Sequence, residues 1–130
     1  MKHILLFLFT TSIIFHYLSQ NPLAIPPVLA GSEINLNLQT GSVQFLPGSA
    51  TSTMGANGDL LGPTIMLERY QDVTMNVTNN LGEPTTIHWH GMHVSPENDG
   101  GPHVVIMPGE TWSPSWNVLD WASTHWYHPH

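Results

Sequence analysis

The sequence contains no cysteine, and only 2 of its 130 residues are Lys or Arg. Without cysteine, disulfide bonds, cysteine-ligated zinc sites, iron–sulfur clusters and thiol nucleophiles are excluded. Against the two cations stand 9 Asp and Glu residues, so the formal net charge is −7. Because nucleic acids and anionic membrane surfaces are bound through clustered Lys and Arg, we expect neither a nucleic-acid partner nor a polybasic membrane contact.

Long apolar runs are also scarce. The stretch from Ile4 to Ile14 is interrupted by hydroxyl residues and falls short of the roughly 20 apolar residues that span a bilayer. Lys2 precedes this stretch and the small residue Ala30 follows it, a pattern typical of a secretory signal peptide over residues 1–30. A retained membrane anchor is the alternative. Both interpretations place the remaining domain outside the cytoplasm, so we expect a periplasmic or secreted protein, with no stable membrane span once a signal peptide is removed.

Residues 31–130 are enough for one domain, and their pattern favours short strands. No apolar repeat of helical period is sustained, whereas Ile34, Leu36 and Leu38 alternate with polar residues. Strands are expected at residues 34–38, 43–46, 64–68, 73–78, 85–90, 103–107, 111–118 and 123–128. The pair 64–68 and 73–78 is expected to form a hairpin, and residues 47–63 a long loop. Short strands separated by Gly and Pro predict a β-sandwich.

Histidine is abundant, with nine in the chain and seven of them between His88 and His130. Two pairs share one spacing, His88-Trp89-His90-Gly91 and His128-Pro129-His130. Because residues i and i+2 of a strand point to the same face, each pair can present two imidazoles to one metal or to two adjacent metals. Imidazole suits copper, zinc, iron and nickel, so the two pairs predict a metal site.

These residues resemble the multicopper oxidases, a family that includes laccases, bilirubin oxidases and bacterial copper-efflux oxidases. The first domain of that family carries an HxHG motif and a later HxH motif after aromatic residues. The resemblance extends to three further segments, Leu61-Gly62-Pro63-Thr64, Asp99-Gly100-Gly101-Pro102 and Pro108-Gly109-Glu110. It implies an N-terminal cupredoxin-like Greek-key β-sandwich over residues 31–130, incomplete at its C-terminal end.

The resemblance also implies roles for individual residues. His88 would be a ligand of a type 2 copper, and His90, His128 and His130 would be ligands of the type 3 copper pair. These coppers form a trinuclear centre that reduces dioxygen to water while a reducing substrate, which the sequence does not identify, is oxidised. Asp99 would be a catalytic residue that assists proton delivery, a role compatible with its place in a turn before Gly100.

Two features of the family are missing from the sequence. The type 1 copper site needs a cysteine, and two further histidine motifs complete the trinuclear centre. We therefore expect a truncated oxidase whose missing C-terminal cupredoxin domains are its partners, and we expect the 130-residue chain alone to be inactive. The alternative is a stand-alone, non-catalytic periplasmic or secreted module that binds copper or zinc.

Three other histidines, His93, His103 and His125, are expected to lie outside the ligand set. His125 forms an HxxHxH spacing with the second pair, but the preceding segments favour the assignment of that pair to the second motif. The five Trp residues are expected to pack in the core and to form a hydrophobic wall around the metal site, rather than a substrate cleft.

Overall fold

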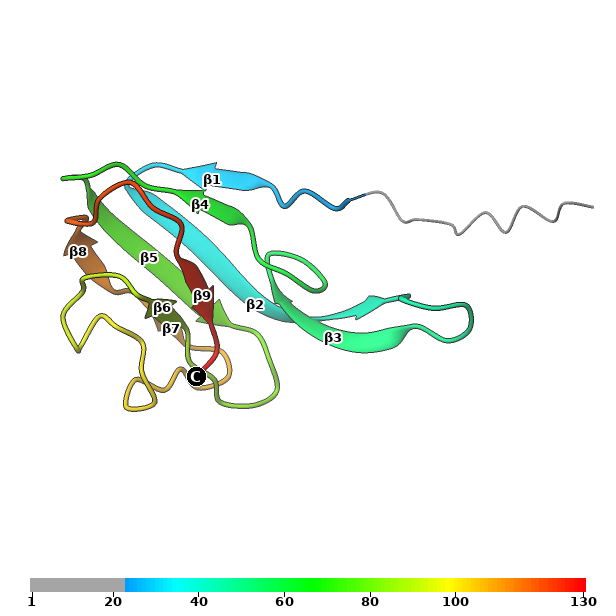
Figure 1. Cartoon of the computed structure of the whole chain (residues 1–130). Coiled ribbons are helices and arrows are strands. Elements are labelled where there is room, and N and C mark those ends of the chain that lie inside the picture. The colour runs from blue at the N-terminus through cyan, green and yellow to red at the C-terminus, as the bar shows by residue number, and fades with distance from the viewer. Residues whose placement is uncertain (1–22) are drawn as a thin grey trace, which may run out of the picture.

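The computed structural model describes residues 23–130, and the fold in this range is built from strands alone (Figure 1). These strands are β1 (Val28–Ala30), β2 (Glu33–Val43), β3 (Thr51–Ala56), β4 (Thr64–Met66), β5 (Asp72–Asn79), β6 (His88–His90), β7 (Thr111–Trp112), β8 (Ser115–Asn117) and β9 (Trp126–His128). The prediction of an all-β domain is confirmed. Within residues 23–130 there is no helix with the length and apolar character needed to cross a membrane.

The larger layer is a sheet with β2 and β5 at its centre. β2 runs parallel to β5 and antiparallel to β3, while β7 and β8 both pair antiparallel with β5. Ile34, Leu36 and Leu38 of β2 are buried, as the alternation in the sequence predicts, and so are Val73 and Met75 of β5. Because successive side chains of a strand point to opposite faces, one face of this sheet forms the core and the other is polar.

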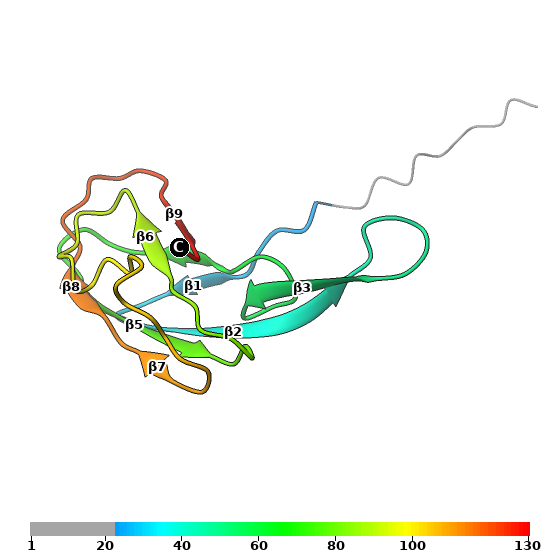
Figure 2. The same ribbon diagram turned by 90° about the horizontal axis from the view of Figure 1, so that it is seen from below.

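The second layer consists of two separate strand pairs. β1 lies parallel to β4, and β6 lies antiparallel to β9. Figure 2 shows the β6–β9 pair facing the main sheet across the core. Ile87 and Trp89 close the core from this side and are 3% and 2% exposed. The β6–β9 pair, which carries both histidine motifs, is therefore fixed on a packed core.

The predicted hairpin between residues 64–68 and 73–78 is wrong. β4 pairs with β1 and β5 pairs with β2, so the intervening turn carries the chain from one layer to the other. That turn contains Tyr70 with a φ of 69° and a hydrogen bond from the Gln71 amide to the Glu68 carbonyl. Two adjacent apolar runs joined by a short turn favour a hairpin when only the local sequence is considered. In this fold each run pairs with a strand of a different sheet instead.

Three further predictions, of one loop and two strands, are corrected by the structure. The predicted loop over residues 47–63 contains β3, which is polar because it pairs with the outer part of β2 and buries only Ala56. The predicted strand over residues 103–107 is reduced to a single bridge between Thr85 and Ile106. The predicted strand over residues 111–118 is divided into β7 and β8, with Pro114, which has no amide hydrogen, between them.

The predicted signal peptide over residues 1–30 lies mostly outside the described residues. Its last three residues form β1, in which Leu29 pairs with Ile65 of β4. Both side chains pack against the buried core. Cleavage after Ala30 would therefore remove β1 and leave that edge of β4 unpaired, and the position of cleavage stays a prediction.

Candidate metal centre

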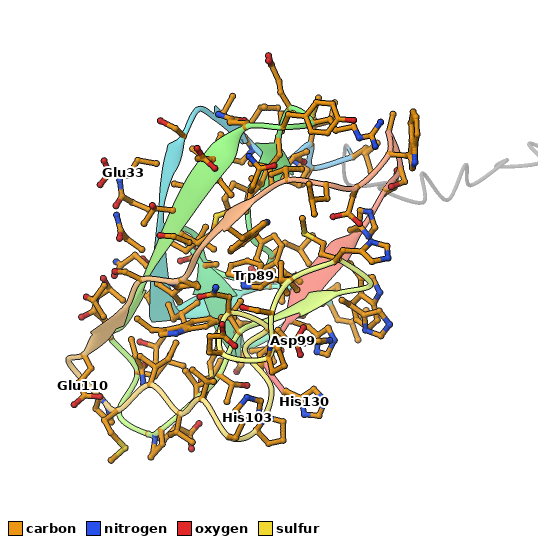
Figure 3. The ribbon with its side chains drawn as sticks, turned by 90° about the vertical axis from the view of Figure 1, so that its left-hand side faces the viewer. Glu33, Trp89, Asp99, His103, Glu110 and His130 are labelled. Atoms are coloured by element: carbon orange, nitrogen blue, oxygen red, sulfur yellow. The ribbon has the colours of Figure 1, made fainter. Side chains whose placement is uncertain are left out.

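The antiparallel pairing of β6 with β9 brings the two histidine motifs together. His88 lies opposite His128, and His90 lies opposite Trp126. The residues between them, Trp89 and Tyr127, point toward the core. Figure 3 shows Trp89 between the two layers. Because side chains alternate along each strand, the imidazoles of both motifs lie together on the opposite face of the pair.

Three of the predicted ligands converge closely enough to hold one ion. Ring nitrogens of His88, His90 and His128 all lie within 4.8 Å of one another. His90 Nδ1 and His128 Nε2 are 3.2 Å apart. Two imidazole nitrogens bound to one ion, each at about 2 Å, lie roughly 3 Å apart, so this spacing fits a shared ion. The ring centroid of His130 lies 5.5 Å from that of His88, as close as the rings of the other three lie to one another, but its ring nitrogens are not among those within 4.8 Å.

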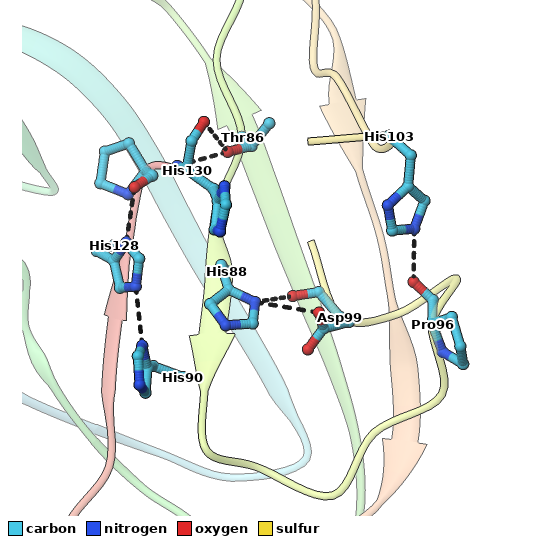
Figure 4. Close-up of polar contacts among 9 residues, drawn as sticks. Thr86, His88, His90, Pro96, Asp99, His103, His128 and His130 are labelled. Atoms are coloured by element: carbon cyan, nitrogen blue, oxygen red, sulfur yellow. Dashed lines mark hydrogen bonds and ion pairs between the residues drawn. The ribbon is translucent and has the colours of Figure 1, made fainter. Parts of the chain in front are cut away.

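Asp99 fixes the orientation of the His88 ring. His88 Nδ1 lies 2.9 Å from the Asp99 carbonyl oxygen and 3.2 Å from its carboxylate Oδ2 (Figure 4). Because a carbonyl oxygen can only accept, Nδ1 carries the proton and Nε2 keeps the free electron pair. Histidines that bind metals commonly donate their other ring nitrogen to a carbonyl or carboxylate in this way. The geometry therefore suits His88 as a ligand through Nε2.

The segment Asp99–Pro102 needs glycine to approach β6. The Trp89 amide donates to the Asp99 carbonyl oxygen, which brings this loop against the strand. Gly100 has a φ of +73°, and a Cβ added there would lie 1.7 Å from the Ile87 carbonyl oxygen. No side chain fits this space, so glycine at position 100 is what allows Asp99 to reach His88.

Thr86 holds the end of the second motif and was not predicted from the sequence. The His130 amide donates to Thr86 Oγ1 at 2.7 Å, and Oγ1 lies 3.3 Å from the His130 carbonyl oxygen (Figure 4). Thr86 is 5% exposed. Thr86 stands two residues before His88. The two-residue period that puts His88 and His90 on one face of a strand is therefore the sequence signal that could have predicted Thr86 on that face.

Thr86→Val keeps the shape of the side chain but removes both hydrogen bonds to His130. We expect the affinity for Cu(II) to fall by about 10-fold, the lower end of the effect typical of groups that orient a ligand. Competition with a chromogenic chelator would measure the affinity, and Thr86→Ser, which keeps the hydroxyl group, should restore it. Unchanged affinity in Thr86→Val would show that Thr86 does not position His130.

Tyr127 connects the second motif to the segment Leu61–Thr64. Its hydroxyl donates to the Pro63 carbonyl oxygen at 2.8 Å. Burial raises the pKa of Tyr127 to about 12, so the phenol stays protonated as a donor at neutral pH. A Cβ on Gly62 would lie 1.9 Å from the Tyr127 hydroxyl oxygen, so this glycine makes room for it. The Leu61–Thr64 segment is thus in direct contact with the residue before the second histidine pair.

A carboxylate outside the predicted site joins the two segments that carry the motifs. Asp120 Oδ1 accepts a hydrogen bond from His93 Nδ1 at 2.5 Å, and both Asp120 oxygens lie 3.3 Å from the His93 amide. The Asp120 side chain is 8% exposed. Burial raises the pKa of Asp120, but the hydrogen bonds from His93 and the charges of His93 and His125 outweigh it and bring the pKa below its ordinary value.

Asp120→Ala should destabilise the fold by about 1 kcal/mol at pH 7, because it removes charge-assisted hydrogen bonds from His93, which solvent partly screens at the exposed His93 ring. The lowered pKa means that this stabilisation is present above the carboxyl pKa of the unfolded chain, about 3.9, and is lost as the pH falls through the folded value. Urea unfolding at pH 7 and at pH 3 measures the difference. The exposed Asp59→Ala is the control and should change little at either pH. A loss in Asp120→Ala that is equal at both pH values would contradict the assignment.

The other histidines do not join the cluster in residues 23–130. His93 is bound to Asp120, His103 Nε2 donates to the Pro96 carbonyl oxygen, and His125 Nε2 lies 2.7 Å from Ser123 Oγ. Their side chains are held by partners elsewhere on the surface, and their exclusion from the ligand set stays a prediction.

The tryptophans divide into two groups. The ring centroids of Trp112 and Trp116 lie 6.2 Å and 5.5 Å from the ring centroid of the buried Trp89, so these three side chains pack together. Trp121 and Trp126 are 76% and 58% exposed, and for these two the prediction of core packing is wrong. Trp126 instead lies against the imidazoles of the site, as expected for a wall around it.

A family model described as multicopper oxidase matches residues 37–130. Multicopper oxidase mco of Staphylococcus aureus is 40% identical over 118 residues, which cover 85% of this chain and 26% of the relative. Cell division protein FtsP of Escherichia coli is 34% identical over 112 residues, which cover 84% of this chain and 24% of that protein.

Solved structures of the same family have the same fold. The laccase-like multicopper oxidase CueO from Ochrobactrum sp. has a TM-score of 0.80 and 42% identity, covering 84% of this chain and 25% of its own. The laccase from Pediococcus acidilactici has a TM-score of 0.79 and 37% identity, covering 85% of this chain and 26% of its own. The chain thus spans about a quarter of the length of the proteins it resembles.

Proposed function

The chain belongs to the multicopper oxidase family, as its N-terminal cupredoxin-type domain, and from this premise we propose that it supplies half of an oxygen-reducing copper centre. In this proposal His88 holds a type 2 copper, and His90, His128 and His130 hold a type 3 pair. Further polypeptide, corresponding to the rest of its relatives, supplies the remaining ligands and the type 1 copper.

The convergence of imidazoles across β6 and β9 is the observation that carries this proposal. His90 Nδ1 and His128 Nε2, from motifs 38 positions apart, are 3.2 Å from each other. His128 Nδ1 lies 2.6 Å from the Pro129 carbonyl oxygen, so it donates there and leaves Nε2 as an acceptor. His90 and His130 are exposed, which leaves this face accessible to ligands from a second domain. An all-imidazole donor set suits copper.

Copper bound here would supply the one-electron chemistry by which dioxygen is reduced to water. The residues of the chain orient the ligands and move protons. Asp99 is suited to both tasks, because its side chain is 32% exposed while Oδ2 lies 3.2 Å from His88 Nδ1. A carboxylate that reaches both solvent and an imidazole can take up a proton outside and hold it beside the centre. Dioxygen and a reducing substrate would be the reactants of the whole enzyme.

We also propose that the domain works in the periplasm or as a secreted protein. The support is the sequence pattern of residues 1–30, in which Lys2 precedes a short apolar stretch. A fusion of residues 1–30 to a reporter that is active only after export would test it. Export of the fusion, and its loss when the apolar stretch is replaced by polar residues, is the expected result, and retention in the cytoplasm would contradict it.

A chimera tests the proposed oxidase function directly. Residues 31–130 would replace the matching segment of the Staphylococcus aureus multicopper oxidase, to which the chain is 40% identical. After loading with copper, the chimera should consume dioxygen in the presence of a phenolic reductant. A folded, copper-loaded chimera that consumes none would contradict the proposal. The unmodified Staphylococcus enzyme is the positive control.

A stand-alone metal-binding module is the second candidate, favoured by the three nitrogens of His88, His90 and His128 within 4.8 Å. Three ligands are enough to hold one divalent ion without another domain. In this case the isolated chain should bind one Cu(II) or Zn(II) tightly, and the chimera should show no oxidase activity. An active chimera would favour the oxidase domain instead.

A further inference from the structure

Trp126 is exposed, yet it lies on the face that carries the proposed ligands. Its side chain is 58% exposed. The register of the β6–β9 pair places it directly opposite His90, and it stands two residues before His128 on its own strand. Both relations put the indole on the same face as these imidazoles. Its position is therefore determined by the same pairing that assembles the metal site.

The indole stacks on two imidazoles at once. Ring centroids are 4.5 Å apart for Trp126 and His90, with an angle of 26° between the planes. They are 4.2 Å apart for Trp126 and His128, with an angle of 27°. The centroids of His90 and His128 are themselves 5.4 Å apart. The three rings thus form a triangle, in which the indole covers both imidazoles without separating the nitrogens that face each other.

Carbonyl oxygens orient two of the proposed ligands, His88 and His128, whereas within residues 23–130 no carbonyl or carboxylate contacts the His90 ring. The Asp99 carbonyl oxygen fixes the His88 ring, and the Pro129 carbonyl oxygen fixes the His128 ring. Within residues 23–130, the only hydrogen-bond partner of the His90 ring is the imidazole of His128. Rotation of an imidazole about its last side-chain bond is otherwise broad. The indole face is the one other group stacked near-parallel on the His90 ring.

We propose that Trp126 is a positioning residue that sets the ring angle of His90 against His128. Its aromatic face takes the place of the carbonyl or carboxylate that orients metal-binding histidines elsewhere. The inference rests on the proposed function, since it takes both histidines as ligands. An aliphatic side chain would cover the same surface but would lack the flat face that keeps the imidazoles near parallel to it.

Variants at position 126 test this in the full chain with Cu(II) as the probe. Trp126→Leu should weaken Cu(II) binding about tenfold and change the copper hyperfine coupling in the electron paramagnetic resonance spectrum. Trp126→Phe keeps an aromatic face and should bind within about threefold of the wild type, with the wild-type spectrum. Trp121→Leu is the matched control, because Trp121 is also exposed but contacts no imidazole of the site. Its ring stacks on Arg69, whose Cζ lies 3.6 Å from the Trp121 ring centroid.

The outcomes separate the two proposals. If the wild type binds Cu(II) through imidazole but Trp126→Leu has the same affinity and spectrum, the role of Trp126 is overturned alone. The same holds if Trp126→Phe is as weak as Trp126→Leu. If the wild type shows no imidazole-bound Cu(II), the ligand assignment fails, and the role of Trp126 fails with it. Should circular dichroism show Trp126→Leu to be unfolded, Trp126→Val, a good strand former, replaces it in the same comparison.

Discussion

Gly100→Ala is expected to destabilise the domain by about 2–5 kcal/mol, a large share of the 5–15 kcal/mol typical of a folded domain. Two costs add at this position. The φ of +73° is unfavourable for any residue with a Cβ, and that Cβ would lie 1.7 Å from the Ile87 carbonyl oxygen. Because the obstacle is backbone of the segment entering β6, it cannot rotate away. Alanine would push the Asp99 loop off this strand.

Gly109→Ala is the matched control for this prediction. Gly109 has a φ of +82°, but a Cβ there would meet nothing within 4 Å. It therefore bears the backbone cost, about 1 kcal/mol, without the clash. Urea unfolding of both variants at pH 7 measures the difference. A Gly100→Ala variant no less stable than Gly109→Ala would show that the contact between the loop and β6 is not rigid.

The His90→Ala substitution is expected to abolish oxygen consumption by the chimera, lowering it more than about 100-fold, beyond the effect of groups that only orient a ligand. His90 supplies one of the two nitrogens that lie 3.2 Å apart, and alanine provides no donor atom in its place. The copper content per chain should fall as well. Its exposed position means that the loss should come with little change in thermal stability.

His103→Ala serves as the control for that substitution. His103 is exposed, and its Nε2 donates to the Pro96 carbonyl oxygen, outside the cluster. This variant should keep oxygen consumption within about threefold of the unsubstituted chimera. It removes no proposed ligand, and a surface substitution of this kind usually changes the free energy of unfolding by less than about 0.5 kcal/mol. Full activity of His90→Ala, with copper bound, would contradict the role of His90 as a ligand.

Local periodicity explains what could be predicted from the sequence. Alternation over Ile34 to Leu38 and over Val73 to Val77 predicts strands with one buried face, and both lie where expected. The same two-residue period predicts that His88 and His90 share a face. The pairing of their strand with β9 follows from the motifs only through the family resemblance, since no local rule sets the partner of a strand.

Long-range contacts explain what could not be predicted. Asp120 and His93 lie 27 residues apart, and neither belongs to a motif that would pair them. The partner of β4 is likewise decided by which layer buries Ile65, and the short turn around Tyr70 gave the opposite indication. Trp126 could be recognised as aromatic in sequence, but its stacking on two imidazoles depends on the register between β6 and β9.

Electron paramagnetic resonance of Cu(II) bound to the chain labelled with ¹⁵N-histidine is the direct test of the four histidines as copper ligands. We expect coupling to imidazole nitrogens at one equivalent of copper. That coupling should persist when His93, His103 and His125 are all replaced by alanine. It should disappear when His88, His90, His128 and His130 are replaced instead. Imidazole coupling that survives loss of these four residues, or that requires the other three, would contradict the assignment of the four histidines as ligands.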